Sequence, residues 1–200
     1  MKAILNIIFL LAVNIALAQY PILSTTSLAD PNDDNFNSNN ANYAVDTSNS
    51  RQQYVGTWEY NQNGILFQLK IEKLDQRFRG IIHNGELQGS YNYYDEVILK
   101  YKLIINGNLL FDNLSETNLE SIKSYGWHRQ SDGYLGGKFL EYTRNVYITY
   151  EINRLFTTPA KINFNLERMI YTLLSPLTSY HQGEKLFLIP TGGIEMIKIN

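Results

Sequence analysis

The stretch that decides the fold is Ile65-Leu66-Phe67-Gln68-Leu69-Lys70-Ile71-Glu72-Lys73. Ile65, Phe67, Leu69 and Ile71 alternate with the polar residues Gln68, Lys70 and Glu72. This period of two is typical of a strand with one buried face, because successive side chains of an extended chain point to opposite sides. The stretch therefore predicts a half-buried β-strand.

The same alternation recurs over most of the chain, interrupted by dipeptides that suit tight hairpin turns. These dipeptides are Asn63-Gly64, Asn84-Gly85, Asn106-Gly107 and Asp132-Gly133. We expect strands at 56–60, 65–73, 77–84, 87–94, 96–105, 108–112, 119–125, 136–142, 145–153, 161–168, 186–189 and 194–199. The only helical pattern covers 166–174, where four apolar residues share a helical face before Pro176. Many short strands without alternating helices predict an all-β antiparallel sandwich or barrel. An up-and-down barrel is the preferred form, because closure removes exposed edges.

The first eighteen residues have the pattern of a secretory signal peptide. A positive start at Lys2 precedes the apolar stretch Ala3–Leu17, and Ala16-Leu17-Ala18 forms a small-residue cleavage site. A membrane anchor is the alternative, but a spanning helix needs roughly 18 or more apolar residues, and this stretch contains Asn6 and Asn14. We therefore expect residues 1–18 to be removed and the chain to be exported, to the periplasm, the cell surface or the outside of the cell, with no later transmembrane segment.

Composition narrows the classes further. The 200 residues contain 17 Lys and Arg, 19 Asp and Glu, and no Cys. The acidic balance disfavours a nucleic-acid partner, and the missing cysteines exclude disulfides and a thiol nucleophile. An exported domain without disulfides must be stabilised by its core, for which about 150 residues suffice.

Residues 19–51 differ in character from the rest. From Asp30 to Ser50 the chain holds seven Asn and four Asp. Such a segment buries too little apolar surface to offset its ordering entropy, so we expect a polar, disordered linker before a barrel domain at 52–200. One competing signal is Ala41–Val45, which could add a short edge strand.

Candidates for chemistry are few. His83, His128 and His181 lack the spacing of a metal site, and Asp95-Glu96 point to opposite faces of an extended chain. No nucleophile motif is present. We therefore expect no catalytic residue, no metal and no cofactor, and a protein that is not an enzyme.

Two pairs of residues are singled out as candidates for structural or binding roles. Gly56 and Trp58 share one face of the first long strand, where Trp58 is expected to plug one barrel end; a ligand contact is the alternative. Tyr91 and Tyr93 share a face in a chain with 15 Tyr. If exposed, they suit contact with a glycan or a protein, while cross-strand aromatic pairing is the structural alternative.

The stretch Tyr54-Val55-Gly56-Thr57-Trp58-Glu59-Tyr60 resembles the Gly-x-Trp opening of lipocalin and calycin barrels. The wider layout resembles an uncharacterised family of small exported bacterial proteins, a domain of unknown function. The features that carry this second resemblance are Val55–Tyr60, the Gly-rich region Gly80–Tyr94, and Ile189-Pro190-Thr191 before Ile194–Ile199.

The resemblance implies a lipocalin-like barrel without assigned catalytic residues. Two functions follow as expectations. One is a barrel that binds a small apolar ligand, and the other is a surface module that binds glycan or protein through exposed Tyr and Asn.

Overall fold

The structure is a computed structural model that describes residues 20–28, 41–128, 133–143, 145–171 and 187–200. Within these ranges the chain is all-β, as expected, with two short 3-10 turns and no α-helix. The strands are β1 (Ser24–Ser27), β2 (Asn42–Val45), β3 (Gly56–Gln62), β4 (Ile65–His83), β5 (Glu86–Ile105), β6 (Asn108–Asp112), β7 (Tyr125–His128), β8 (Leu135–Glu141), β9 (Val146–Leu155), β10 (Lys161–Tyr171) and β11 (Ile194–Lys198). The 3-10 turns are η1 (Ser50–Tyr54) and η2 (Leu119–Ser121).

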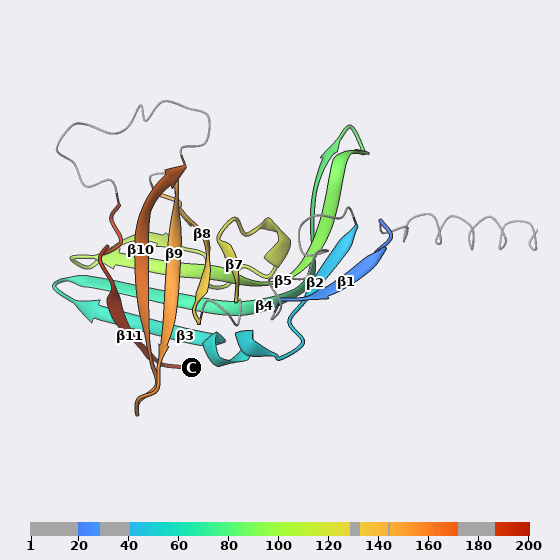
Figure 1. Cartoon of the computed structure of the whole chain (residues 1–200). Helices are drawn as coiled ribbons and strands as arrows, with labels where there is room; N and C mark the ends of the chain where they lie inside the picture. The colour runs from blue at the N-terminus through green and yellow to red at the C-terminus, as the bar shows by residue number, and fades with distance from the viewer. Residues whose placement is uncertain (1–19, 29–40, 129–132, 144, 172–186) are drawn as a thin grey trace, which may run out of the picture.

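The strands form one sheet that closes on itself (Figure 1). Its order is β1-β2-β5-β4-β3-β11-β10-β9-β8-β7, and β7 also pairs with β5. The pairings thus lead from β5 through β4, β3, β11, β10, β9, β8 and β7 back to β5. These eight strands form a closed ring, which we call the ring below. Strand β6 pairs with β5 outside this path, and β1 and β2 extend the sheet beyond β5.

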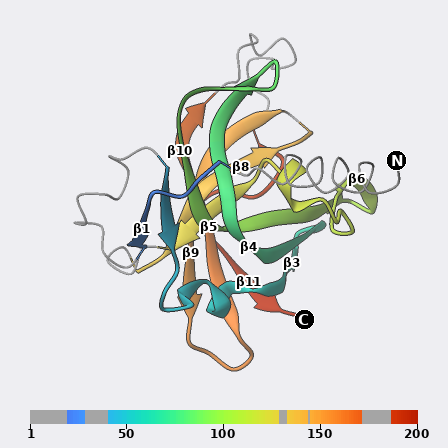
Figure 2. The same ribbon diagram turned by 90° about the vertical axis from the view of Figure 1, so that its right-hand side faces the viewer.

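Strands β4 and β5 are much longer than we predicted. Each merges two expected strands, because bulges between Leu74 and Arg77 and between Arg79 and Ile81 let the pairing continue past an irregularity. At the first bulge Gln76 has a φ of 56°. The far part of the β4–β5 hairpin consequently bends away from the ring, rising at the right of Figure 1 and standing at the top of Figure 2.

The predicted helix at 166–174 is wrong over its described part. Strand β10 runs to Tyr171 and pairs with β9, with a bulge between Glu167 and Ile170. The bulge breaks the alternation of apolar residues, so their spacing imitates a helical face. The remainder of the predicted helix, 172–174, lies outside the described residues.

Two other predicted strands also differ from the structure. The segment predicted as a strand at 119–125 begins with the turn η2, and its strand starts only at Tyr125. Residues 187–189 form no strand, although Ile189 is buried in the core.

The predicted linker at 19–51 is corrected where it is described. Strand β1 pairs in parallel with β2, and β2 pairs in parallel with β5. The competing signal at Ala41–Val45 was therefore the better guide, since Ala41 and Ala44 are fully buried. These segments belong to the same sheet as the predicted barrel domain at 52–200. The predicted signal peptide, residues 1–18, lies outside the described residues.

One glycine makes room for a large side chain inside the ring. Gly126 of β7 lies opposite Gly137 of β8, which in turn lies opposite Tyr150 of β9. A Cβ at Gly126 would lie 2.1 Å from the Tyr150 hydroxyl oxygen and 2.3 Å from the Gly136 carbonyl oxygen. The ring thus holds the Tyr150 side chain only because glycine occupies that position.

We expect Tyr150→Phe to stabilise the protein. The Tyr150 hydroxyl is buried without a hydrogen-bond partner among the described residues, and burial raises its pKa well above the usual value. Removing an unsatisfied buried hydroxyl should raise the free energy of unfolding by about 1 kcal/mol. Urea unfolding of the variant and the parent measures the difference. A loss of stability would show that the hydroxyl has a partner.

Candidate functional site

The middle of the ring is filled by its own side chains. The Phe164 ring of β10 lies 5.7 Å from Phe67 of β4 and 5.7 Å from Phe139 of β8. Tyr101 of β5 lies 5.2 Å from Phe139. All four residues are fully buried. Aromatic rings from four strands therefore meet inside the ring, and a ligand in this middle layer would have to displace them.

Trp58 closes one end of this core. It is fully buried, and its indole nitrogen donates a hydrogen bond of 2.7 Å to the Tyr54 carbonyl oxygen. The Arg154 guanidinium carbon lies 5.2 Å and the Lys198 ammonium 5.5 Å from its ring centroid, a cation-π arrangement. Trp58 is thus a buried core residue beneath cations of β9 and β11, and its role as a plug stays a prediction.

Gly56 is required at the same end for a steric reason. Its φ is +134°, and a Cβ there would lie 2.4 Å from the Asn200 carbonyl oxygen and 2.5 Å from Cε of Lys198. The Thr57 amide also donates to the Asn200 carbonyl oxygen over 2.9 Å. Gly56 therefore lets the last residues of the chain pack against the first ring strand.

Towards the β3–β4 turn the fully buried core gives way to half-buried apolar side chains. Cross-strand neighbours place Tyr60, Phe67, Leu103 and Phe111 in one layer, one step closer to the β3–β4 turn than Trp58. This turn and the β5–β6 turn lie together at the left of Figure 1. We call the half-buried residues packed on the core here the rim. They are Tyr60, Ile65, Ile105, Phe111 and Tyr142.

The rim is rich in aromatic surface. The rings of Phe111 and Tyr142 are stacked, with centroids 4.6 Å apart and 9° between their planes. Phe111 also lies 4.5 Å from Tyr101, whose hydroxyl accepts a hydrogen bond from the Tyr142 amide. Burial raises the pKa of Tyr101. The rim is thus an ordered apolar surface joined directly to the filled core.

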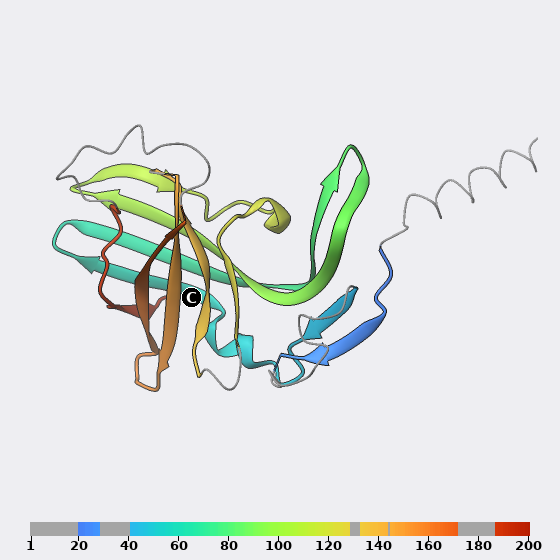
Figure 3. The same ribbon diagram turned by 45° about the horizontal axis from the view of Figure 1, so that its top comes forward.

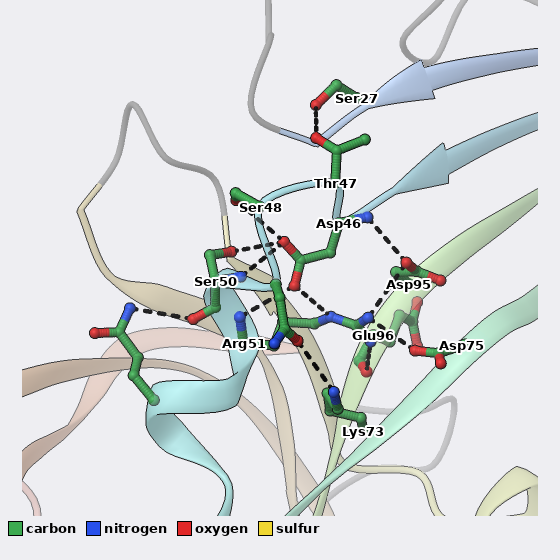
Figure 4. Close-up of polar contacts among 12 residues, drawn as sticks. Ser27, Asp46, Thr47, Ser48, Ser50, Arg51, Lys73, Asp75, Asp95 and Glu96 are labelled. Carbon is green, nitrogen blue, oxygen red and sulfur yellow. Dashed lines mark hydrogen bonds and ion pairs between the residues drawn. The ribbon is translucent and has the colours of Figure 1, made fainter.

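A second cluster is polar and lies where the β4–β5 hairpin leaves the ring (Figure 4). At its centre is Arg51 of η1, whose side chain is only 4% exposed. Its guanidinium lies 2.9 Å from Asp46, 2.8 Å from Asp75 and 3.2 Å from Asp95. It also donates to the carbonyl oxygen of Glu96 over 2.8 Å. One arginine therefore joins the segment before the ring to both strands of the hairpin.

The carboxylates of this cluster accept hydrogen bonds from backbone amides as well as forming ion pairs. Asp95 accepts hydrogen bonds from the Asp46 amide, the Tyr43 hydroxyl and the Gln76 amide. The Gln76 contact fixes the first bulge of β4. Burial alone would raise the pKa of Asp46, but hydrogen bonds from Arg51 and Ser50 lower it. Burial and the nearby Asp95 raise the pKa of Tyr43.

Glu96 forms a separate buried centre beside the first. Its carboxylate lies 2.6 Å from Arg79 and 3.3 Å from Arg77, while its side chain is 1% exposed. The Arg79 guanidinium also stacks over the Tyr125 ring at 3.6 Å. Although adjacent in sequence, Asp95 and Glu96 bind different partners. Asp95 binds Arg51, two backbone amides and a hydroxyl, whereas the Glu96 carboxylate binds two arginines. These contacts position the hairpin.

Tyr91 and Tyr93 are buried, so the solvent-facing cluster expected there is wrong. They are 6% and 4% exposed. Their hydroxyls donate to the carbonyl oxygens of Pro21 and Tyr20, each over 2.7 Å. The residues that cover them come from the segment that we predicted to be disordered. The alternative of cross-strand aromatic pairing describes their setting, since Phe78 of β4 pairs with Tyr93 and the two ring centroids lie 5.6 Å apart.

The remaining candidates are scattered. His83 is exposed at the tip of the β4–β5 hairpin, His128 is buried 5.6 Å from the Tyr54 ring, and His181 lies outside the described residues. Across the described ranges no group of three His, Asp or Glu could hold a metal ion. No helix in the described part of the chain is long and apolar enough to cross a membrane.

A loop and a buried lysine line an open pocket of about 260 Å³ on the outer face of β4 and β5. Lys100 donates to the Glu116 carbonyl oxygen over 2.8 Å and pairs with Glu72. Glu72 also lies 2.9 Å from Lys70. The Glu72 carboxylate lies between two lysines that face each other across β4 and β5. Lys100 is held in place by this carboxylate and attaches the loop to the sheet through Glu116.

The fold and site thus define an all-β protein with a filled ring, an apolar rim and a buried polar junction. Residues 1–198 match the model of a family of unknown function, DUF6705, and the chain belongs to this family. The expectation of a family without an assigned role is confirmed. No curated protein and no solved structure matches the chain.

Proposed function

We propose that this protein is an exported, non-enzymatic binding module of lipocalin-like form that holds a small apolar group at the rim. The observation that carries the proposal is the contrast between the two ends of the core. One end is closed by Trp58 beneath Arg154 and Lys198, whereas the other presents half-buried aromatic rings.

The strand connectivity supports the lipocalin-like form. The eight strands of the ring follow one another in sequence order, with β6 as an excursion outside the ring between β5 and β7, as in an up-and-down barrel. The filled middle layer limits the depth of binding, so the apolar group rests against Phe111 and Tyr142 rather than beside Phe164. Apolar surfaces with few polar groups are typical of sites for small ligands.

A surface module that binds glycan or protein is the second candidate, with weaker support. Its proposed contacts, Tyr91 and Tyr93, are covered by the chain's own Tyr20 and Pro21. Binding through them would require that segment to leave. The rim needs no such rearrangement.

Fluorescence of the apolar probe N-phenyl-1-naphthylamine tests the rim. We expect the probe to bind the whole chain with enhanced emission, and Phe111→Leu to weaken its affinity about fivefold, the equivalent of ~1 kcal/mol of lost aromatic contact. The matched control is Phe156→Leu, because Phe156 is 90% exposed in the β9–β10 loop at the other end. Equal affinities of the two variants would contradict the rim as the site.

A further inference from the structure

The loop between β6 and β7 is attached to β5 at both of its ends. At its start the Asn113 amide donates to the Tyr101 carbonyl oxygen over 3.1 Å, and the Asn113 side-chain oxygen accepts from the Tyr101 amide over 2.7 Å. At its end the Ser124 carbonyl oxygen accepts from the Leu99 amide over 3.0 Å. Lys100 lies between these two attachments. Figure 3 shows this yellow-green loop, with its turn η2, alongside β5.

The open pocket of about 260 Å³ described above lies between this loop and the outer face of β4 and β5. Sites for drug-sized ligands usually have volumes of about 300–1,000 Å³, so this pocket suits a smaller molecule. Its strand side is charged. Its loop side combines two apolar and two hydroxyl side chains, which are Leu114, Leu119, Ser115 and Thr117.

The strand side of the pocket has more positive than negative charge. Glu72 is the ion-pair partner of both Lys70 and Lys100, so one carboxylate serves two ammoniums. The other acidic residue of the lining, Glu116, uses its carboxylate to accept the Asn118 amide of its own loop over 2.8 Å. The Lys100 side chain is only 3% exposed, and buried charges are screened much less by salt than exposed ones. The pocket therefore favours an anion.

The groups with spare hydrogen-bonding capacity in the pocket are donors. An ammonium has three N–H groups, and the described partner of the Lys70 ammonium is Glu72. The Lys70 side chain is 36% exposed, so its remaining N–H groups are accessible. The Ser115 and Thr117 hydroxyls have no hydrogen-bond partner among the residues that the structure describes. A ligand rich in acceptors matches these three side chains.

We propose that this pocket binds a small organic oxyanion, a carboxylate or a phosphate ester with a short apolar tail. The oxyanion accepts hydrogen bonds from the Lys70 ammonium and from the hydroxyls of Ser115 and Thr117, while the tail contacts Leu114 and Leu119. Hydrogen bonds to ionised partners are roughly twice as strong as neutral ones, so Lys70 provides the largest share of the affinity. The site is on the outer face of the sheet and does not depend on the rim.

Nuclear magnetic resonance titration of the ¹⁵N-labelled whole chain tests the site. The probes are hexanoate, hexyl phosphate and neutral hexanol, which share the same tail. We expect saturable shifts of the Ser115, Thr117 and Leu119 amide signals with at least one anion, and the tighter anion identifies the head group. Hexanol should bind at least about tenfold more weakly, the equivalent of ~1.4 kcal/mol. Equal affinities for the anions and hexanol, or no saturable shift with either anion, would overturn the proposal.

Two lysine variants assign the binding to this pocket. Lys70→Met removes the ammonium and should weaken the tighter anion about tenfold, or ~1.4 kcal/mol. The matched control is Lys102→Met, because Lys102 lies on the same face of β5 but pairs with Asp112 at 3.4 Å outside the pocket lining. It should change the affinity less than about twofold. An unchanged affinity in Lys70→Met, with amide shifts outside the pocket like those of the parent, would contradict the site. A larger loss in Phe111→Leu than in Lys70→Met would place the ligand at the rim instead.

Discussion

Trp58→Ala should lower the free energy of unfolding by roughly 3–5 kcal/mol, the cost of removing a large buried aromatic side chain. The indole is fully buried, its nitrogen bonds to Tyr54, and Arg154 and Lys198 lie over its ring. Its loss would leave a cavity at the closed end of the core and remove the support of both cations. Urea or thermal unfolding followed by tryptophan fluorescence and circular dichroism measures the change.

Trp127→Ala is the matched control for that experiment. Trp127 is half-buried and packs on Tyr94 outside the main core, with ring centroids 6.4 Å apart. We expect it to lose clearly less stability than Trp58→Ala. An unchanged melting temperature in Trp58→Ala would show that Trp58 does not close the core.

Arg51→Met should destabilise the protein by about 3–5 kcal/mol, because it breaks a buried ion pair and leaves carboxylates without their partner. The side chains of Asp46 and Asp95 are 1% and 5% exposed, so water cannot replace the guanidinium without rearrangement. The segment before the ring should separate from the hairpin first. Hydrogen exchange should accordingly accelerate at the Asp46 and Gln76 amides, which donate to Asp95.

Lys73→Met provides the comparison for Arg51→Met. Lys73 lies next to the same cluster, and its contact of 3.1 Å to the Asn49 side chain is exposed. We expect it to change the free energy of unfolding by less than about 0.5 kcal/mol. Comparable losses of unfolding free energy in the two variants would mean that the buried ion pairs of Arg51 do not stabilise the protein more than the exposed contact of Lys73.

The fold class could be predicted because alternation and turn chemistry are local properties. The turns Asn63-Gly64, Asn84-Gly85 and Asn106-Gly107 all have positive φ at both residues. The joined strands could not be predicted, because a bulge such as that at Gln76 depends on a distant carboxylate, here Asp95. Likewise, the bulge after Glu167 gave strand β10 an apparent helical period.

The polar junction was missed for a related reason. By composition, residues 41–51 look like a disordered tail. Their order depends on Arg51, whose partners lie on β4 and β5, and composition does not reveal such contacts. One signal was present in the sequence. Asp95-Glu96 lies directly between Tyr93-Tyr94 and Val97-Ile98-Leu99, and buried charges need partners. Seeking an unassigned Arg would have drawn attention to Arg51.

The placement of the tyrosines shows the same limit. Spacing correctly put Tyr91 and Tyr93 on one face, but it could not show that Tyr20 and Pro21 cover that face, because the contact spans about seventy residues. The rim was equally invisible. The rim consists of the apolar layers nearest the β3–β4 turn. Which residues form those layers depends on the pairing register of the strands.

The central claim is that the ring is filled and binds apolar groups only at its rim. Intermolecular nuclear Overhauser effects between bound N-phenyl-1-naphthylamine and assigned side chains measure this directly. The account predicts contacts from the probe to the rings of Phe111 and Tyr142, and none to Leu69, Leu99 or Phe139 in the middle of the core. Contacts to Leu69 or Phe139 would contradict it, because the probe would then lie inside a ring that opens.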